Sequence, residues 1–315
     1  MNFQQLRSIR EAARRNFNLT EVANVLFTSQ PGVSRQILEV EEELGIAIFE
    51  RNGKRLVGLT EPGKGILPIV ERLLLEAENL RRAGNDFSAQ GRGTLSIATT
   101  HTQARYVLPS VVQQFRLAFP DVRIALQQSA PEHIAEWVLS GKADIGIATE
   151  GLSQFKDLIS FPCYEWNHVV VVPKAHPLGN VERVSLQELA KYPLITYDQG
   201  FTGRGHIDAA FKKLDLQPDI VLTAMDSDVI QQYVALGLGV GIVASMAVES
   251  RPGTGQSQNL ETLSASHLFE ANTTRLAVRR GAYLRAYTVN FIQRFAPSLS
   301  LEMINTALGA GVENN

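Results

Sequence analysis

The stretch NLTEVANVLFTSQPGVSRQILEVEEELGIAIFERNGKR, residues 18–55, decides the fold of the N-terminal part of the chain. Residues 19–26 have the length and composition of a short helix, and residues 27–29 interrupt the apolar spacing. A second helix is predicted over residues 30–44, because Val33, Ile37, Val40 and Leu44 stand at i, i+4, i+7 and i+11. Two amphipathic helices joined by so short a turn predict a helix-turn-helix, although other small helical bundles contain the same pair.

The polar residues at the start of the second helix are of the types that contact DNA. A serine suits the N-cap, and the proline two residues later falls in the first turn, where a missing N–H costs nothing. Acidic residues 39 and 41–43 would repel phosphates, so only the first two turns are expected to approach DNA. The residues expected to contact DNA from this helix are Ser29, Gln30, Pro31, Ser34 and Arg35.

A β-hairpin is predicted directly after the second helix. Residues 46–49 and 56–59 are short β-prone runs, and Asn52-Gly53 between them is a tight-turn signal. With a further helix from residue 3 to about residue 17, the hairpin makes this domain a winged helix. The tip of the wing carries Arg51, Lys54 and Arg55, which we expect to contact the DNA backbone or minor groove; a solvated turn is the alternative.

Length, charge and composition limit the classes of protein to which the chain can belong. A chain of 315 residues is long enough for two or three domains, and a formal net charge of −2 does not by itself indicate nucleic-acid binding. The first 57 residues carry eight basic and seven acidic residues, so phosphate contacts must come from local placement. A single cysteine, Cys163, six histidines without metal-ligand spacing and no signal peptide or membrane-spanning run predict a cytoplasmic protein without a bound metal.

A long linker helix is predicted to begin after Thr60, with Pro62 in its first turn. Steps of four and three along this helix place a regular apolar seam on one side, which predicts a coiled coil that pairs two copies of the chain. A single helix packed on its own domain is the alternative. Gly84 is expected to break the helix, and residues 88–93 to form a hinge. The seam consists of Ile66, Val70, Leu73, Ala77 and Leu80.

From residue 94 onward short apolar strands alternate with helical stretches, which predicts α/β units with a largely parallel sheet. About 200 residues of this pattern fit two subdomains better than one sheet, with crossings near residues 162–164 and 267–269. The expected domains are therefore a winged helix-turn-helix over 1–60, a linker helix and hinge over 61–92, and an effector domain over 93–315. Its subdomain I is expected at about 93–163 and 268–300, and its subdomain II at about 164–267.

Three strand ends carry threonine hydroxyls beside the start of a helix or turn. They are ATTHTQARY (98–106), IATE (147–150) and GFTGR (200–204). Hydroxyls and free N–H groups at helix starts bind an oxyanion without a formal counter-charge. For any one of the three, plain helix capping is the simpler explanation, but three such ends in two subdomains favour one shared anion site.

The run SQPGVSRQILEVEEELGIAIFERNGKRL, followed by LTEPG, resembles the signature of LysR-type transcriptional regulators, and the rest of the chain matches that family in order and length. The resemblance implies a winged helix-turn-helix, a linker helix and an effector domain similar to the two-lobed periplasmic solute-binding fold. It implies double-stranded promoter DNA as a partner, dimers through the linker helix that pair into tetramers, and RNA polymerase as a further candidate partner. No cofactor, membrane contact or enzymatic activity is implied.

Within the family, ATTHTQARY, IATE, GFTGR and GLGVGIVASMAV resemble the cysteine-regulon activators. This narrower resemblance implies control of sulfur-assimilation and cysteine-biosynthesis genes, with sulfate, adenosine 5′-phosphosulfate or O- or N-acetylserine as effector. Carried over to this chain, the anion site consists of Thr100, Thr102, Gln103, Thr149 and Thr202, and Arg204 either adds charge or faces solvent.

Three alternatives stay open at this point. The first is a LysR-type regulator of another pathway with a different small effector. The second is a solute-binding protein, against which the predicted linker helix and the absence of a signal peptide argue. The third is an enzyme, but no GxSxG elbow occurs, and the glycine-rich run 237–241 follows a helix and precedes a strand, the reverse of a dinucleotide-binding loop.

Overall fold

The structure is a computed structural model that describes residues 1–89, 92–201, 203–249 and 259–309. The chain divides into two compact units, Met1–Ser88 and Ala89–Asn315. Each unit has a hydrophobic core of its own.

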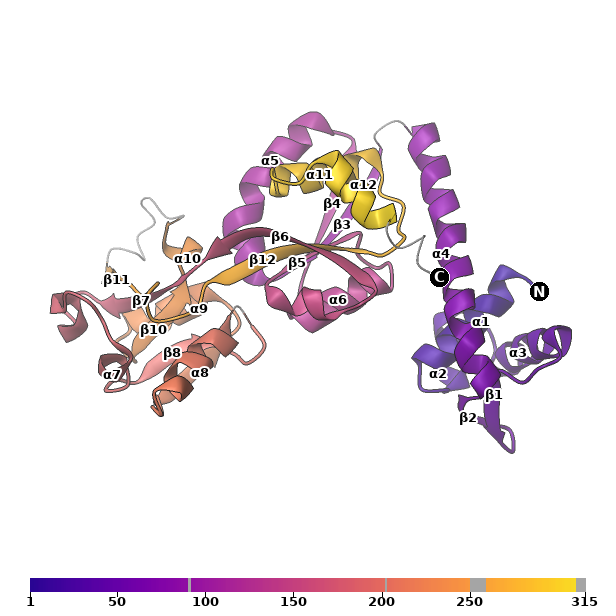
Figure 1. The fold of residues 1–315 in the computed structure, drawn as a ribbon, viewed down its shortest axis with the longest axis horizontal. Coiled ribbons are helices and arrows are strands. Elements are labelled where there is room, and N and C mark those ends of the chain that lie inside the picture. The colour runs from indigo at the N-terminus through magenta and orange to yellow at the C-terminus, as the bar shows by residue number, and fades with distance from the viewer. Residues whose placement is uncertain (90–91, 202, 250–258, 310–315) are drawn as a thin grey trace. The chain divides into compact units, whose positions relative to one another are not determined.

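The first unit is a three-helix core with a wing (Figure 1). Its helices are α1 (Phe3–Arg14), α2 (Leu19–Val25) and α3 (Gln30–Leu44), capped at their N-termini by Asn2, Asn18 and Ser29. Three residues of the apolar face predicted for α3 are buried, since Val33, Ile37 and Val40 are at most 1% exposed, whereas the fourth, Leu44 at the end of the helix, is 42% exposed. Helix α1 ends three residues earlier than predicted, because Asn16 and Phe17 adopt positive φ angles of 48° and 64°.

The wing consists of β1 (Phe49–Asn52) and β2 (Arg55–Leu59), paired antiparallel. The first strand begins three residues later than predicted, since Ile48 is buried in the core ahead of the hairpin. Asn52 pairs with Arg55, so Gly53 and Lys54 are the turn residues rather than Asn52-Gly53. Gly53 has a φ of +62°, which matches the hairpin turns that require glycine at the first central position.

Helix α4 (Glu61–Ala89) continues through Gly84, so the predicted break there is wrong. A lone glycine costs a helix about 1 kcal/mol, which is not enough to end one of this length. The predicted hinge is helical at residues 88–89, and residues 90–91 lie outside the described residues. The predicted seam is also divided: Val70 packs into the core of the first unit, whereas Leu73 and Leu80 are 42% and 75% exposed.

The second unit contains two five-stranded sheets with the same arrangement of strands. One has the order β4-β3-β5-β12-β6 and the other β9-β8-β10-β7-β11. In each sheet three neighbouring strands pair in parallel, the fourth runs antiparallel to them, and the edge strand pairs antiparallel with the fourth. Four of the five strands therefore run in the same direction, so each sheet is largely parallel, as predicted, with one reversed strand, β12 or β7. The first sheet consists of β3 (Gly93–Thr99), β4 (Val122–Gln128), β5 (Ile145–Ala148), β6 (Leu158–Trp166) and β12 (Asn272–Arg279). The second consists of β7 (His168–Pro173), β8 (Leu194–Tyr197), β9 (Ile220–Ala224), β10 (Val240–Ala244) and β11 (Leu260–Ser264).

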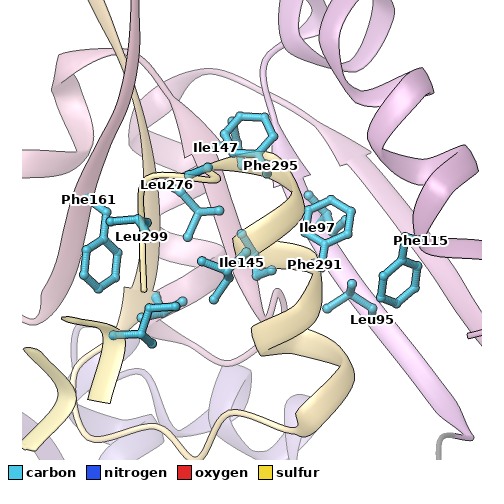
Figure 2. Close-up of a cluster of buried hydrophobic side chains, with 14 of the residues drawn as sticks. Leu95, Ile97, Phe115, Ile145, Ile147, Phe161, Leu276, Phe291, Phe295 and Leu299 are labelled. Atoms are coloured by element: carbon cyan, nitrogen blue, oxygen red, sulfur yellow. The ribbon is translucent and has the colours of Figure 1, made fainter. Parts of the chain in front are cut away.

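Helices cover both faces of the first sheet. Helices α5 (Leu108–Ala118), α11 (Ala286–Phe295) and α12 (Leu301–Gly309) lie on one face, and α6 (Pro131–Leu139) lies on the other (Figure 1). Figure 2 shows the larger of the two cores, in which Phe115 of α5 and Phe291 of α11 approach strand residues such as Ile97. The two phenylalanine rings contact edge to face with their centroids 5.5 Å apart. The carboxyl ends of β3 and β5 are thereby held at a fixed position.

Strands β6 and β12 are the segments through which the chain passes between the two subdomains. The first includes the predicted crossing at residues 162–164, whereas the second begins at Asn272, after the predicted 267–269. Residues 267–269 lie in the turn between β11 and β12. The second subdomain is completed by α7 (Leu186–Leu189), α8 (Arg204–Lys213), α9 (Ser227–Ala235) and α10 (Met246–Glu249). Helices α10, α11 and α12 and strand β11 were not predicted from the sequence, and the second crossing segment was placed too early in the chain.

We expect the start of α4 to tolerate no side chain at Gly63. A Cβ there would lie 2.0 Å from the carbonyl oxygen of Ile48, whereas a Cβ at Gly65 would meet nothing within 4 Å. Gly63→Ala should therefore destabilise the first unit by about 1–3 kcal/mol. The matched Gly65→Ala should be neutral or stabilise it by up to about 1 kcal/mol. Hydrogen exchange of amides in residues 1–60 measures both; equal effects of the two variants would contradict this packing.

Candidate DNA-binding surface and effector site

The start of α3 presents the residues predicted to contact DNA. Ser29 caps the helix by accepting a hydrogen bond from the Gly32 N–H at 3.2 Å. Gln30, Pro31 and Arg35 are exposed, and Ser34 is half-buried beside the apolar face. The Arg35 side chain is 82% exposed and donates from Nε to Glu39 Oε1 at 2.8 Å. The charge of Glu39, which was expected to repel phosphates, is thus paired with the arginine one turn before it.

The three basic residues of the wing differ in whether their side chains are free to contact DNA. Arg51 donates to the carboxylate of Glu41 at 2.6 Å, and the Glu41 side chain is only 8% exposed. The same carboxylate accepts the N–H groups of Ile48 and Phe49 at 2.8 and 3.0 Å. Arg51 therefore holds the wing against α3, whereas Lys54 and Arg55 are exposed.

A groove of about 470 Å³ joins the wing to the helix-turn-helix. Asn52, Lys54 and Arg55 line one side, and the starts of α2 and α3, through Asn18 and Gln30, line the other. The wing tip and the two helix starts consequently form one continuous polar and basic surface. Sequence reasoning identified the wing and α3 but not the contribution of α2.

In the second unit, sheet register brings two of the predicted anion-site segments together. Strands β3 and β5 are parallel, with Thr99 opposite Ile147, so Thr100 and Thr149 follow at the same edge of the sheet. Both side chains are buried, at 5% and 7% exposure. Thr149 precedes the 3₁₀ turn η2 (Glu150–Gln154), but its side chain makes no capping hydrogen bond.

Thr102 is the most informative residue of this edge. It precedes a π-helical turn, η1 (Gln103–Val107), and makes no capping hydrogen bond with its side chain. The residue is 1% exposed, and its buried Oγ1 makes no hydrogen bond of normal geometry, although it lies near the Tyr197 hydroxyl, which is already bonded to Ser227 and to the Ala244 N–H. An unpaired buried hydroxyl costs free energy and is rare in native proteins. Plain helix capping, the simpler explanation considered for this stretch, does not account for the buried Thr102 hydroxyl.

Gln103 is fixed by residues that sequence reasoning missed. Its Nε2 donates to Thr274 Oγ1 at 3.1 Å, and its Oε1 accepts from the hydroxyl of Tyr164. Trp166 Nε1 donates to the same Thr274 hydroxyl at 3.1 Å. Burial raises the pKa of Tyr164 to about 12, so its hydroxyl stays protonated and remains a donor. Nothing in the sequence connected strands β6 and β12 to this helix start.

The segment after β8 is the counterpart of this edge in the second sheet, because β8 holds the same place in its sheet as β3 in the first. Thr202 lies outside the described residues, so its predicted role stays a prediction. Arg204 begins α8 and is 7% exposed. It donates to the carbonyl of Tyr197 and, at 2.7 Å, to Asp208, so these two groups hold the guanidinium against the strand end.

Contacts between the subdomains lie next to the predicted anion site. Asp228, in the first turn of α9, accepts from the hydroxyl of Tyr106 at 3.0 Å and pairs with Arg105 Nε at 3.2 Å. Gln103 Nε2 also lies 3.9 Å from the sulfur of Met246 in α10. The π-helical turn that follows Thr102 is thus one of the elements through which the first subdomain contacts the second.

Within the ranges that the structure describes, no three His, Cys, Asp or Glu side chains are placed to hold a metal ion. No helix in these same ranges combines the length and apolar character that crossing a bilayer requires. Burial raises the pKa of Cys163 to about 11, which keeps this thiol protonated and unreactive near neutral pH.

The unpaired hydroxyl of Thr102 gives a test on the ligand-free protein. Thr102→Val should leave the free energy of unfolding of the second unit unchanged or raise it by about 1 kcal/mol, since the hydroxyl has no partner to lose. The matched Thr274→Val should lower it by about 1–3 kcal/mol, because it leaves two buried N–H donors without an acceptor. Both tryptophans lie in the second unit, so urea unfolding followed by fluorescence reports both variants. A large loss in Thr102→Val would mean that its hydroxyl is bonded.

Two family models match the chain. "Bacterial regulatory helix-turn-helix protein, lysR family" matches residues 3–64, and "LysR substrate binding domain" matches residues 88–300. Together they cover the winged helix, the start of α4 and both sheets of the second unit. They therefore confirm the family resemblance that the sequence motifs indicated.

Full-length relatives agree with this assignment. The chain is 57% identical to the HTH-type transcriptional regulator SsuR of Burkholderia cenocepacia over 300 residues, 95% of this chain and 96% of the relative. It is 50% identical to the HTH-type transcriptional regulator CysB of the same organism over 314 residues, 100% of this chain and 99% of the relative. The second unit is similar to the crystal structure of the cofactor-binding domain of the Cbl transcriptional regulator, with 48% sequence identity and a TM-score of 0.66. The match covers 69% of this chain and 93% of the Cbl domain. The chain belongs to the LysR family of transcriptional regulators.

Proposed function

We propose that this regulator activates genes of sulfur assimilation and cysteine biosynthesis in response to a small anion. The effector is sulfate, adenosine 5′-phosphosulfate or O- or N-acetylserine, held by Thr100, Thr102, Gln103, Thr149 and Thr202. The observation that carries the proposal is the buried, unpaired hydroxyl of Thr102 at the start of a helix. The likeness to SsuR, CysB and Cbl supports it, together with the strings ATTHTQARY, IATE and GFTGR.

The donor set suits an anion. Thr100, Thr102, Thr149 and Gln103 offer hydroxyl and amide groups without formal charge, and the first N–H groups of the helix after Thr100 have no helical carbonyl to bond. Oriented N–H groups and the helix dipole stabilise negative charge at such a place. An oxyanion there would accept a hydrogen bond from the Thr102 hydroxyl and so offset the free-energy cost of burying that hydroxyl.

The first unit supplies the DNA-binding surface in this proposal. The start of α3 enters the major groove, where Gln30, Ser34 and Arg35 meet base edges, and the exposed Lys54 and Arg55 contact phosphates. The groove lined by α2, α3 and the wing supports a continuous footprint on one duplex. Arg51 is assigned mainly to holding the wing, because its guanidinium is paired with the buried Glu41.

Self-association is part of the same proposal. Ile69, Leu73 and Leu80 leave an exposed apolar stripe along α4, which fits pairing of two linker helices. In the second unit the edge strands β4 and β9 carry exposed apolar side chains, Leu126 and Val221, and Leu236 is exposed directly after the neighbouring α9. These surfaces allow two kinds of contact between copies, as a dimer of dimers requires.

Control of transcription follows from the position of the anion site beside the contacts between subdomains. An anion bound more tightly by one arrangement of the two sheets shifts the population toward that arrangement. The π-helical turn η1 links the two events, since Thr102 and Gln103 are at its start and Arg105 and Tyr106 contact Asp228. The cytoplasm is the compartment that fits a regulator of this kind.

Calorimetric titration with sulfate, adenosine 5′-phosphosulfate and O-acetylserine tests the effector. At least one should bind saturably to the full-length protein, and Thr102→Val should weaken that binding about tenfold or more, the value of a hydrogen bond to a charged group. Thr262→Val, the same chemical change on the exposed face of β11, should bind as the unmodified protein does. Absence of binding by all three compounds would remove the sulfur assignment and leave a LysR-family regulator with a different effector.

Salt dependence of DNA binding tests the wing. Lys54→Ala should weaken binding to operator and to non-operator duplexes by similar factors and reduce the slope of log K against log salt by about 1, as loss of one phosphate contact requires. Lys156→Ala, which removes an exposed charge from the second unit, serves as the control. Fluorescence anisotropy with a duplex selected from a random-sequence library measures both; an unchanged slope for Lys54→Ala would mean that this lysine stays in solvent.

A further inference from the structure

A chain of hydrogen bonds runs from the N-terminus of α1 to the exposed guanidinium of Arg35. Gln5, in the first turn of α1, donates from Nε2 to Glu39 Oε2 at 2.8 Å. The other oxygen of the same carboxylate, Oε1, accepts from Arg35 Nε at 2.8 Å. Both oxygens of Glu39 are thus engaged, one by a residue of α1 and one by the arginine on its own helix.

The orientation of the Gln5 amide is set independently of Glu39. Gln5 Oε1 accepts the backbone N–H of Asn2 at 2.7 Å, the reciprocal half of the capping box that starts α1. Since the amide oxygen is occupied there, the amide NH₂ must face Glu39. Gln5 is 8% exposed, so the glutamine has little freedom to turn elsewhere. The fold of α1 therefore determines where the Glu39 carboxylate lies.

This arrangement restricts an arginine that is otherwise free. The Arg35 side chain is 82% exposed, and an exposed pair of this kind adds little to stability. Its effect is on geometry: with Nε bound to Glu39, the two terminal amino groups remain for a ligand. Two N–H groups in a rigid fork match the O6 and N7 acceptors of guanine in the major groove. Ordering the side chain before binding also reduces the entropy lost on binding.

We propose that Gln5, acting through Glu39, is a positioning residue that orients Arg35 to read a guanine edge in the operator. The inference rests on the proposed role of α3 in DNA binding. It gives Glu39 a role opposite to that expected from its charge: the carboxylate directs the arginine that binds the base, and its repulsion of phosphates is secondary.

Gln5→Glu tests the link with the least disturbance. A glutamate at this position can still accept the Asn2 N–H, so the capping box is kept, but it replaces the donor to Glu39 by a second carboxylate. The ratio of operator to non-operator affinity should fall about three- to tenfold for the full-length protein. An added negative charge weakens binding to both duplexes by similar factors, so this effect cancels in the ratio of the two affinities. Asn2→Ala, which weakens the same cap but keeps the backbone N–H and Gln5, should leave the ratio unchanged.

Glu39→Gln separates positioning from charge repulsion. If Glu39 only repels phosphates, removing its charge tightens binding to both duplexes equally and the ratio stays constant. If it positions Arg35, the ratio falls even though binding to non-operator DNA tightens. Residue 39 is on the surface of α3, so this variant folds even if Gln5→Glu does not.

Arg35→Ala completes the test as a double-mutant cycle. The single variant should lower the affinity ratio about tenfold or more, as loss of a two-bond base contact does, and Gln5→Glu should then have no further effect on it. An unchanged ratio in Arg35→Ala would overturn Arg35 as a reader and with it that part of the proposed function. A reduced ratio in Arg35→Ala, with Gln5→Glu and Glu39→Gln both unchanged, would overturn the positioning role alone.

Discussion

The winged helix depends on one buried carboxylate. Glu41 accepts two backbone N–H groups at the entry to the wing and pairs with Arg51 inside it, so a single side chain of α3 fixes where β1 begins. Removing the carboxylate would leave the N–H groups of Ile48 and Phe49 without their acceptor, at a cost of about 1–3 kcal/mol for each buried donor. The distance between the start of α3 and the wing tip, and therefore the width of DNA that both can span, follows from this contact.

The second unit depends on a constraint of topology. In each sheet the first of the three parallel strands, β3 or β8, lies between the other two. The connections from these two neighbours therefore lie on opposite sides of the central strand, and such a point in an α/β sheet is where ligands bind. Helix starts at the carboxyl ends of β3 and β8 are consequently free of covering strands. The same strand order in both sheets makes the segment Thr100–Gln103 after β3 and the residues Gly203 and Arg204 after β8 counterparts, although the sequence shows no repeat.

Much of this could be predicted from the sequence where the signal is local. Apolar spacing located α3, the alternation of short apolar runs with helical stretches indicated two α/β subdomains, and Ser29 and Thr60 marked helix starts that the structure confirms. The failures have physical causes. Gly84 carries a propensity penalty too small to end a long helix, and β12 lies in the sheet only because residues far away in sequence pair with it. The partners of Gln103, which are Tyr164 and Thr274, were out of reach for the same reason.

Helix α4 has a consequence for how the chain folds. Its first half packs Val70 and Leu74 into the core of the winged helix, whereas Leu80, farther along, is 75% exposed. The first half thus folds with its own domain, whereas the second half would gain further apolar contacts in the pairing of linker helices proposed above. If two linker helices pair as proposed, helix content in the C-terminal turns of α4 should rise with protein concentration, so that this part of the linker is most rigid in the assembled protein.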